Sequence, residues 1–293
     1  MTTSIIKQRG GRNYRQRQIV NRFMLVLCGI AAFVAIVPLV WIIVYVTQQG
    51  ARFISIDFFT QEPTPVGIPG GGVANAIVGS AMVVGIACVI AIPIAIVAAF
   101  YSSENPNTPL GVALRFGTDV LSGVPSIVMG MFAFAIIVLP QKHFSALSGG
   151  IALAIIMTPI VLRTTEEMLK LVPRNLREGS LALGASEWKT TLQVLLPAAI
   201  NGVVTGIMLG IARVAGEAAP MIFTAFGNPN LSIEINQPIA TLPHTIYVYA
   251  IAPYKDWHDK AWTTAFVLIV LVLGLNITAR LFTAWRLKKM GWR

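Results

Sequence analysis

The chain has 293 residues, of which 55% are hydrophobic and only 12% are charged. A soluble domain carries about 25% charged residues. This composition, with a mean hydropathy of +0.72, excludes a soluble enzyme, a DNA-binding module and a secreted disulfide scaffold. The net charge of +10 is typical of a membrane protein whose Lys and Arg residues keep loops in the cytoplasm, so we expect the lipid bilayer, and no nucleic acid, as a partner. The fold class that follows is an all-α integral membrane protein.

Six segments are apolar enough to cross the hydrocarbon core, which takes about 20 residues per helix. They are residues 23–46, 73–100, 116–140, 147–162, 196–223 and 261–283. The fourth segment is short, and we expect its helix to continue through the polar residues 163–171. The first segment follows a basic tail, as in a signal peptide, but its apolar run is too long for one, so we expect a retained membrane anchor.

The distribution of basic residues predicts the orientation of these six transmembrane helices. Of the 22 Lys and Arg residues, 17 lie in the tails and loops on the N-terminal side of the membrane. Only 4 lie in the opposite loops, and Arg213 lies inside the fifth segment. Since cytoplasmic loops carry the excess of Lys and Arg, both termini are predicted to be cytoplasmic.

The chain carries none of the common catalytic or metal-binding motifs. It has no G-x-x-x-x-G-K-S/T phosphate loop, no H-E-x-x-H and no G-x-S-x-G. The three histidines are scattered over outer loops, and Cys28 and Cys88 lie in apolar runs, so neither a metal site nor a disulfide is expected. We therefore expect that the chain is not an enzyme and that transport is its function.

Residues 163–197 form the longest inner loop, and its residue types predict two short helices on the cytoplasmic face. Residues 178–183 suit the first helix, and Gly184 suits a left-handed turn that ends it. Ser186 is placed to cap a second helix, with Glu187 in its first turn. Pro197 is tolerated where the fifth transmembrane segment begins. An ordinary amphipathic loop is the alternative interpretation.

The spacing in this loop resembles the EAA loop of ABC-importer permeases, E-A-A-x3-G-x9-I-x-L-P. Gly179-Ser180 stand where two alanines are frequent in the family, and Val194 stands for isoleucine. The resemblance implies a MetI-like fold in which a separate ATPase subunit docks on residues 173–197. ATP and Mg would be bound by that partner, so this chain would need no cofactor and no metal. The docking residues so implied are Glu178, Gly179, Ser180, Gly184, Ala185, Ser186, Glu187, Leu196 and Pro197.

Residues 70–80, 124–130 and 242–262 resemble phosphate-importer permeases of the Pst system, the last stretch resembling the PstA type. This resemblance implies a basic cytoplasmic tail over 1–22, a first transmembrane helix and periplasmic loop over 23–72, an ABC type-1 permease domain over 73–285 and a cytoplasmic tail over 286–293. It further implies a heterodimer with a PstC-like permease, a PstB-like ATPase homodimer, and a PstS-like periplasmic phosphate-binding protein. The location implied is the bacterial cytoplasmic (inner) membrane.

Four charged residues near or inside the predicted spans are the candidate substrate path. Arg163 and Glu166 are three residues apart, and Arg213 and Glu217 are four apart, so each pair shares a helix face. A guanidinium binds phosphate bidentately, and a neighbouring carboxylate would weaken that grip enough for release. The alternatives are that Arg163 reaches the inner lipid headgroups and that Arg213–Glu217 is a purely structural pair.

Two other functions stay open at this stage. Permeases for sulfate, molybdate or phosphonate share the EAA-type loop, and a self-sufficient secondary anion transporter could use the same charged pairs as a relay. A membrane-embedded enzyme lacks a catalytic cluster. Import of an anion against an inside-negative potential requires about 2.3 kcal/mol per charge per 100 mV. ATP-driven import by alternating access is therefore the preferred hypothesis.

Overall fold

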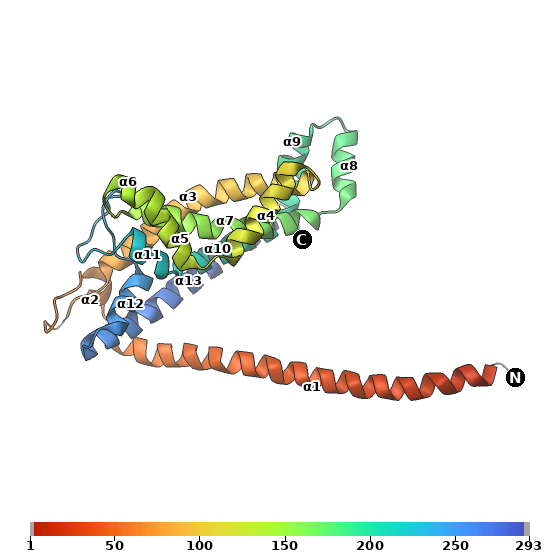
Figure 1. The fold of residues 1–293 in the computed structure, drawn as a ribbon, viewed down its shortest axis with the longest axis horizontal. Coiled ribbons are helices and arrows are strands. Elements are labelled where there is room, and N and C mark those ends of the chain that lie inside the picture. Colours follow the sequence, from red (N-terminus) through yellow and green to blue (C-terminus); the bar gives the residue numbers. More distant parts are fainter. Residues whose placement is uncertain (1–2, 69, 290–293) are drawn as a thin grey trace.

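The computed structural model describes residues 3–68 and 70–289, so residues 1–2 and 290–293 of the predicted terminal tails, and Pro69, lie outside the described residues. Within that range the chain is helical, with an isolated bridge between Phe226 and Ile239 and no named strand. The helices, shown in Figure 1, are α1 (Thr3–Gly50), α2 (Ile56–Thr60), α3 (Ala74–Glu104), α4 (Pro109–Gly123), α5 (Ser126–Ala133), α6 (Leu139–Gln141), α7 (Ala146–Lys170), α8 (Arg174–Ala182), α9 (Glu187–Thr190), α10 (Leu196–Ala215), α11 (Ala219–Thr224), α12 (Leu242–Ile251) and α13 (Lys255–Lys289).

Five helical segments of the described chain are long and apolar enough to cross a membrane, and a bent pair makes a sixth. The bent pair corrects the third predicted span: α4 and the α5–α6 segment meet at an angle of 107°, so residues 116–140 are not one straight helix. The bend lies at Val124, which has extended backbone (φ −76°, ψ 131°). Pro125 explains it, because a proline disfavours helical backbone in the residue before it.

The fifth predicted span also differs from the structure at both ends. Its helix begins earlier than predicted, and the candidate span covers Glu187–Ala215. The predicted continuation to residue 223 is wrong, because α10 ends at Ala215 and α11 begins only at Ala219. Gly216 is the C-cap residue of α10, and its N–H group donates to the carbonyl oxygens of Arg213 and Val214.

Helix α7 is the centre of the bundle, packed between α3 and α10. The face of α3 toward the core is a stripe of small residues in which Ala87, Ala91, Ala95 and Ala99 are all fully buried. On α10, Gly202, Gly206 and Gly210 follow the same four-residue spacing, and each lies directly against α7. Small residues let helix backbones approach closely, which is the main source of packing energy between helices in a bilayer.

Two intramembrane prolines each follow a single wide π-helical turn. Residues Phe134–Val138 precede Pro140, and Thr191–Leu195 precede Pro197. A proline clashes with the carbonyl four residues before it and lacks an N–H group. The wider turn moves that carbonyl away, so the helix passes through the proline without breaking. Pro197 therefore lies within a longer helix and not at the first turn of a span.

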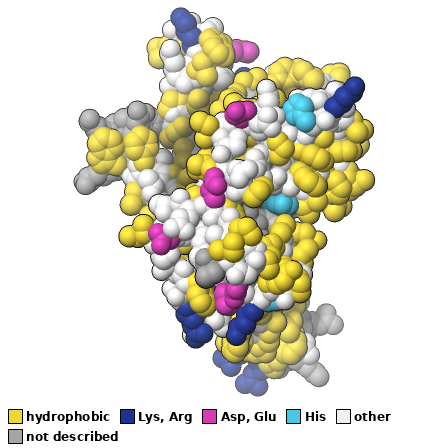
Figure 2. All heavy atoms as spheres, turned by 90° about the vertical axis from the view of Figure 1, so that its left-hand side faces the viewer, with side chains coloured by type: hydrophobic (Ala, Val, Ile, Leu, Met, Phe, Trp, Pro, Cys, Tyr) yellow, Lys and Arg dark blue, Asp and Glu magenta, His cyan; other side chains and the backbone are white. Residues whose placement is uncertain are grey.

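The two ends of the molecule are formed by different elements. The N-terminal end of α1 lies at the same end as α8 and α9, opposite α2 and α12 (Figure 1). This arrangement agrees with the predicted cytoplasmic position of the N-terminus and of the inner loop. At the opposite end, acidic and basic side chains are scattered among hydrophobic and neutral ones (Figure 2). Helix α1 contacts α13 near its outer end, where the Tyr45 and Trp262 rings meet edge to face, and then diverges from the bundle.

Candidate functional site

The charged residue Arg213 lies beside a largely apolar cavity. It is in the last turn of α10, and its side chain is 60% exposed. The cavity has a volume of about 480 Å³ and lies where α4 bends into α5. The other lining residues are Leu121, Ser122, Val124, Ser126, Met129, Ile156, Pro159, Ile160 and Leu209. Since Ile156, Pro159 and Ile160 belong to the middle of α7, the cavity lies level with the middle of that helix, on a side where Leu209 and Arg213 are exposed.

The predicted pairing of Arg213 with Glu217 is confirmed, but it is a loose contact. Arg213 Nη2 lies 3.5 Å from Glu217 Oε1. No hydrogen bond from the Arg213 side chain is found within the described part of the chain. The Glu217 side chain is largely buried and faces the core, near Ser80 and Thr241. The guanidinium therefore has a carboxylate beside it while its donor groups stay available to an anion.

The predicted pairing of Arg163 with Glu166 is wrong. Arg163 instead donates from Nε to Glu167 Oε1 at 2.9 Å, and both of these side chains are about half exposed. On a helix, residues three and four positions away are both neighbours, so Glu166 and Glu167 are both within reach of Arg163. The pair it makes lies on the outside of α7, away from the cavity that Arg213 lines.

Glu166 is fully buried and holds two cations that belong to different helices. Its Oε1 atom lies 2.7 Å from Arg115 Nε and 2.7 Å from Lys170 Nζ. Arg115 also donates to the Oγ and carbonyl oxygen of Ser102, at 3.1 and 2.8 Å. This cluster joins α3, α4 and α7 near the cytoplasmic end of the bundle. Lys170 is four residues after Glu166, a spacing that is visible in the sequence. Arg115 is 51 residues away from Glu166, so the sequence analysis did not predict this pair.

The inner loop folds largely as predicted. Helix α8 ends at Ala182, and Gly184 has left-handed backbone with φ of +84°. Glu187 opens α9, as expected for a carboxylate at a helix N-terminus. Ser186 occupies the capping position but its side chain makes no capping hydrogen bond, so that detail of the prediction is wrong. The Ser180 and Thr190 hydroxyls, 2.9 Å apart, join the two short helices.

Large hydrophobic side chains are exposed on this loop among residues that are mostly polar. Leu183 is 90% exposed and Trp188 is 70% exposed. Arg177 of α8 forms an ion pair with Glu104 at the end of α3. The short helices are thus attached to the bundle while presenting large hydrophobic side chains outward. Such side chains are typical anchors of a protein interface.

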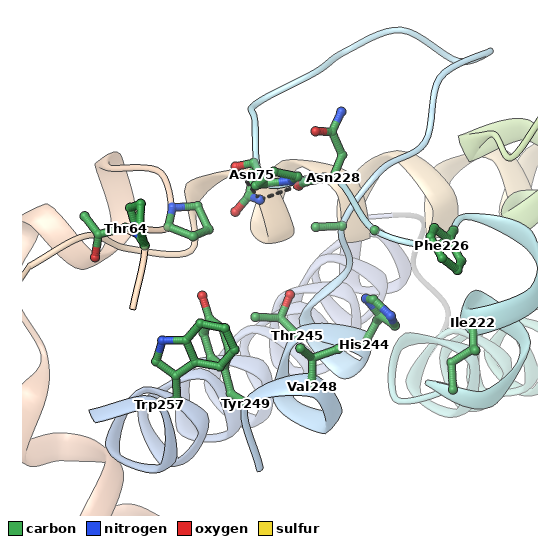
Figure 3. Close-up of a pocket in the computed structure, with 15 residues that line it drawn as sticks. Thr64, Asn75, Ile222, Phe226, Asn228, His244, Thr245, Val248, Tyr249 and Trp257 are labelled. Atoms are coloured by element: carbon green, nitrogen blue, oxygen red, sulfur yellow. Dashed lines mark hydrogen bonds between the residues drawn. The ribbon is translucent and has the colours of Figure 1, made fainter. Parts of the chain in front are cut away.

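A second cavity, of about 580 Å³, opens at the end of the molecule opposite the inner loop. Asn75 and Asn228 lie on one side of it, and Thr245, Val248, Tyr249 and Trp257 lie across from them (Figure 3). The Asn75 side chain donates to the carbonyl oxygens of Asn228 and Pro229, at 2.7 and 3.0 Å. Its Oδ1 atom is buried without a hydrogen-bond partner. Burial also lowers the pKa of His244, which lines the same cavity.

Comparisons with known proteins identify the family. Residues 91–291 match the family described as binding-protein-dependent transport system inner membrane component. The phosphate transport system permease protein PstA of Haemophilus influenzae is 42% identical over 91% of this chain and 94% of its own length. The probable phosphate transport system permease protein PstA of Methanocaldococcus jannaschii is 34% identical, over 90% and 94%. The chain belongs to the PstA permease family.

Solved structures agree with this assignment at the level of the fold. The MetNI methionine ABC transporter in an inward-facing conformation gives a TM-score of 0.56 over 71% of this PstA-family chain and 92% of its own, at 18% identity. An amino acid ABC transporter gives 0.52 over 71% and 91%, at 15% identity. The predicted MetI-like, all-helical membrane fold is confirmed. As a member of the PstA family, the chain is an integral membrane transport subunit of an ABC importer.

No group of three or more His, Cys, Asp or Glu side chains that could hold a metal ion lies within residues that the structure describes. Cys28 and Cys88 are both free thiols. The polar groups described above lie in four places in this PstA-family chain: the Arg213 cavity, the Glu166 cluster, the inner loop and the outer cavity.

Proposed function

We propose that the chain is the permease subunit of an ATP-driven importer of inorganic phosphate in the bacterial cytoplasmic (inner) membrane. The observation that carries the proposal is the Arg213 guanidinium, which lines a cavity level with the middle of α7 and has only a loose 3.5 Å contact with Glu217. A charged side chain at bilayer depth is costly, at about 2.5–3.5 kcal/mol on insertion scales, and it marks a substrate pathway. Similarity to PstA proteins over nine-tenths of the chain names phosphate as the anion.

Arg213 and Glu217 are the path residues that the geometry favours. The 3.5 Å contact holds the guanidinium near the cavity and leaves it free to exchange partners. A path must bind an anion and also release it, and a competing carboxylate serves the release. The path role predicted for Arg163 and Glu166 stays a prediction, because neither residue lines the Arg213 cavity.

ATP hydrolysis would be supplied by a PstB-like homodimer that binds the inner loop. The exposed side chains of Leu183 and Trp188 offer apolar contact area, and the left-handed turn at Gly184 sets the angle between α8 and α9. ATP and Mg would be bound by that partner. The coupling residues are those of the EAA-type motif, Glu178, Gly179, Ser180, Gly184, Ala185, Ser186, Glu187, Leu196 and Pro197.

A PstC-like subunit would complete the pathway as the second half of a heterodimer. Between Tyr14 and Tyr45 every described side chain of α1 is exposed, including Phe33 and Trp41. A cavity of about 500 Å³ runs along this helix. Helix association in a bilayer depends on close packing, and apart from the contact of Tyr45 with Trp262 this stretch stays exposed within the described part of the chain. At the outer end, the uncharged cavity around Asn75 suits docking of a PstS-like phosphate-binding protein.

The test is phosphate uptake by proteoliposomes that contain the complete importer and internal ATP. Arg213→Gln should abolish uptake, whereas Arg163→Gln, which changes a half-exposed pair on α7 away from the Arg213 cavity, should retain most of it. An in-frame deletion of residues 178–189 should leave the protein in the membrane and abolish uptake. Uptake that survives the deletion and needs no ATP would instead indicate a secondary anion transporter.

The substrate is tested by competition within the same assay. An importer for phosphate should show ATP-driven accumulation of phosphate that excess sulfate, molybdate or phosphonate does not suppress. Accumulation of one of those anions in preference to phosphate would assign the chain to the corresponding oxyanion permease. The Arg213 prediction holds for either anion, because a guanidinium binds any tetrahedral oxyanion.

A further inference from the structure

The cavity that Arg213 lines also presents two serine hydroxyls, and these lie on either side of the bend between α4 and α5. Ser122 is in the last turn of α4, and Ser126 is the first residue of α5. The rest of the lining is apolar, with Met129, Ile156, Pro159 and Leu209 among its residues. Because the remaining lining is apolar, the side chains of Arg213, Ser122 and Ser126 are the polar groups that the lining offers to a ligand.

The two hydroxyls are in different hydrogen-bonding states. Ser122 Oγ donates its proton to the carbonyl oxygen of Thr118 at 2.8 Å, one turn earlier in α4. Its oxygen therefore has lone pairs to offer and no proton. Ser126 makes no side-chain hydrogen bond to any residue that the structure describes, so its O–H group is free to donate. Arg213 adds further donors in a fixed planar arrangement.

We propose that Arg213, Ser126 and Ser122 together form a binding site for a protonated tetrahedral oxyanion at the broken third span. Arg213 and Ser126 donate to the charged oxygens, and Ser122 accepts from the O–H group of the anion. Inorganic phosphate keeps at least one proton at neutral pH, whereas sulfate keeps none and would place a bare oxygen against the Ser122 lone pairs. The site thus selects phosphate within the membrane, and this inference rests on the proposed function.

Site occupancy is tested by protection of a thiol introduced at the site. In a Cys28→Ala, Cys88→Ala background, Ser126→Cys is reacted with a small, water-soluble thiol reagent in the reconstituted importer. Phosphate should slow the reaction, an equal concentration of sulfate should not, and Arg213→Gln should remove the protection. Equal reaction rates with and without phosphate would overturn the site. Equal protection by both anions would overturn the selective role of Ser122.

The transport test compares Ser126→Ala with Ser126→Thr, which keeps the hydroxyl. Loss of one hydrogen bond to a charged ligand should reduce ATP-driven phosphate uptake about tenfold in the alanine variant, and the threonine variant should retain uptake. Thr205→Val is the matched control. The Thr205 hydroxyl also lies on a transmembrane helix, and it donates to the carbonyl oxygen of Asn201, one turn earlier in α10. Full uptake by Ser126→Ala, beside lost uptake by Arg213→Gln, would refute this inference and leave the proposed function standing. If both variants keep full uptake, the Arg213 path fails as well.

Discussion

Removing the Arg115 side chain should destabilise the cytoplasmic end of the bundle. Glu166 is completely buried, and its Oε2 atom already has no hydrogen-bond partner. Its charge is compensated only through Oε1, by Arg115 and Lys170 at 2.7 Å each and by the Ser102 hydroxyl at 3.2 Å. The change Arg115→Gln removes one of the two cations and the bonds that tie α4 to Ser102 of α3.

The expected loss in unfolding free energy depends on how much of the Glu166 charge is still compensated in the variant. Breaking a buried ion pair by removing one partner costs about 3–5 kcal/mol. Lys170 stays in place, so the expected loss in unfolding free energy for Arg115→Gln is at the lower end, about 3 kcal/mol. The double variant Arg115→Gln, Glu166→Gln replaces the ions with two amides. It should recover at least about 1 kcal/mol relative to the sum of the single variants.

The measurement is SDS-driven unfolding of the purified protein in mixed micelles, followed by tryptophan fluorescence. Arg163→Gln is the control, because its partner Glu167 is half exposed and such pairs contribute less than about 1 kcal/mol. The reasoning is refuted if Arg115→Gln and Arg163→Gln lower the unfolding free energy equally. It is also refuted if the two changes at Arg115 and Glu166 are simply additive.

Three further predictions concern the turn, the packing and the outer cavity. Gly184→Ala forces a left-handed residue (φ +84°) to carry a side chain, which costs about 1 kcal/mol and should weaken co-purification of the ATPase subunit. Gly206→Val places a Cβ atom 2.7 Å from Thr164 Cβ. Overpacking of this kind costs about 1–3 kcal/mol, and it should lower the yield of folded protein in detergent. Burial lowers the pKa of His244, so the unfolded chain takes up this proton first as the pH falls. The contribution of His244 is therefore complete above about pH 6.5 and is lost below it. His244→Asn should accordingly lose less stability than the parent chain when the unfolding assay is moved from about pH 7.5 to about pH 5.5.

Hydropathy and charge were sufficient to predict the membrane class, the number of spans and their orientation, because each depends on composition over a long window. The form of the third span was not predicted, although its cause is visible in the sequence. Gly123-Val124-Pro125 stands in the middle of the predicted segment 116–140. An apolar window counts these residues as ordinary span, whereas a proline disfavours helical backbone in the residue before it. The proline that marks the bend is visible in the sequence, but the high mean hydropathy of residues 116–140 led to the prediction of one straight span.

Side-chain partners were predicted only where they lie on one helix. Arg213–Glu217 was predicted from the four-residue spacing, whereas Lys170–Glu166, which has the same spacing, was not predicted. Arg163 had acidic residues both three and four positions away, and spacing alone does not decide between them. Arg115 reaches Glu166 from another helix. A contact of that kind depends on how α4 packs against α7, which no pattern within either helix specifies.

The contrast between Arg115 and Arg213 gives a physical criterion for separating structural from functional charge in this bundle. Both are arginines beside a glutamate in the folded chain, but only Arg213 was predicted as a path residue from the sequence. The Arg115 side chain donates to a carboxylate, a hydroxyl and two carbonyl oxygens, so each of its three nitrogen atoms already has a partner in the protein. Arg213 has a single 3.5 Å ionic contact and faces a cavity. A charged side chain at the centre of a bilayer costs about 2.5–3.5 kcal/mol on insertion scales, so the fold retains Arg213 at a loss of stability. We attribute its retention to a role in anion transport. Arg213→Met should therefore raise the unfolding free energy while abolishing uptake, and Arg115→Met should lower it.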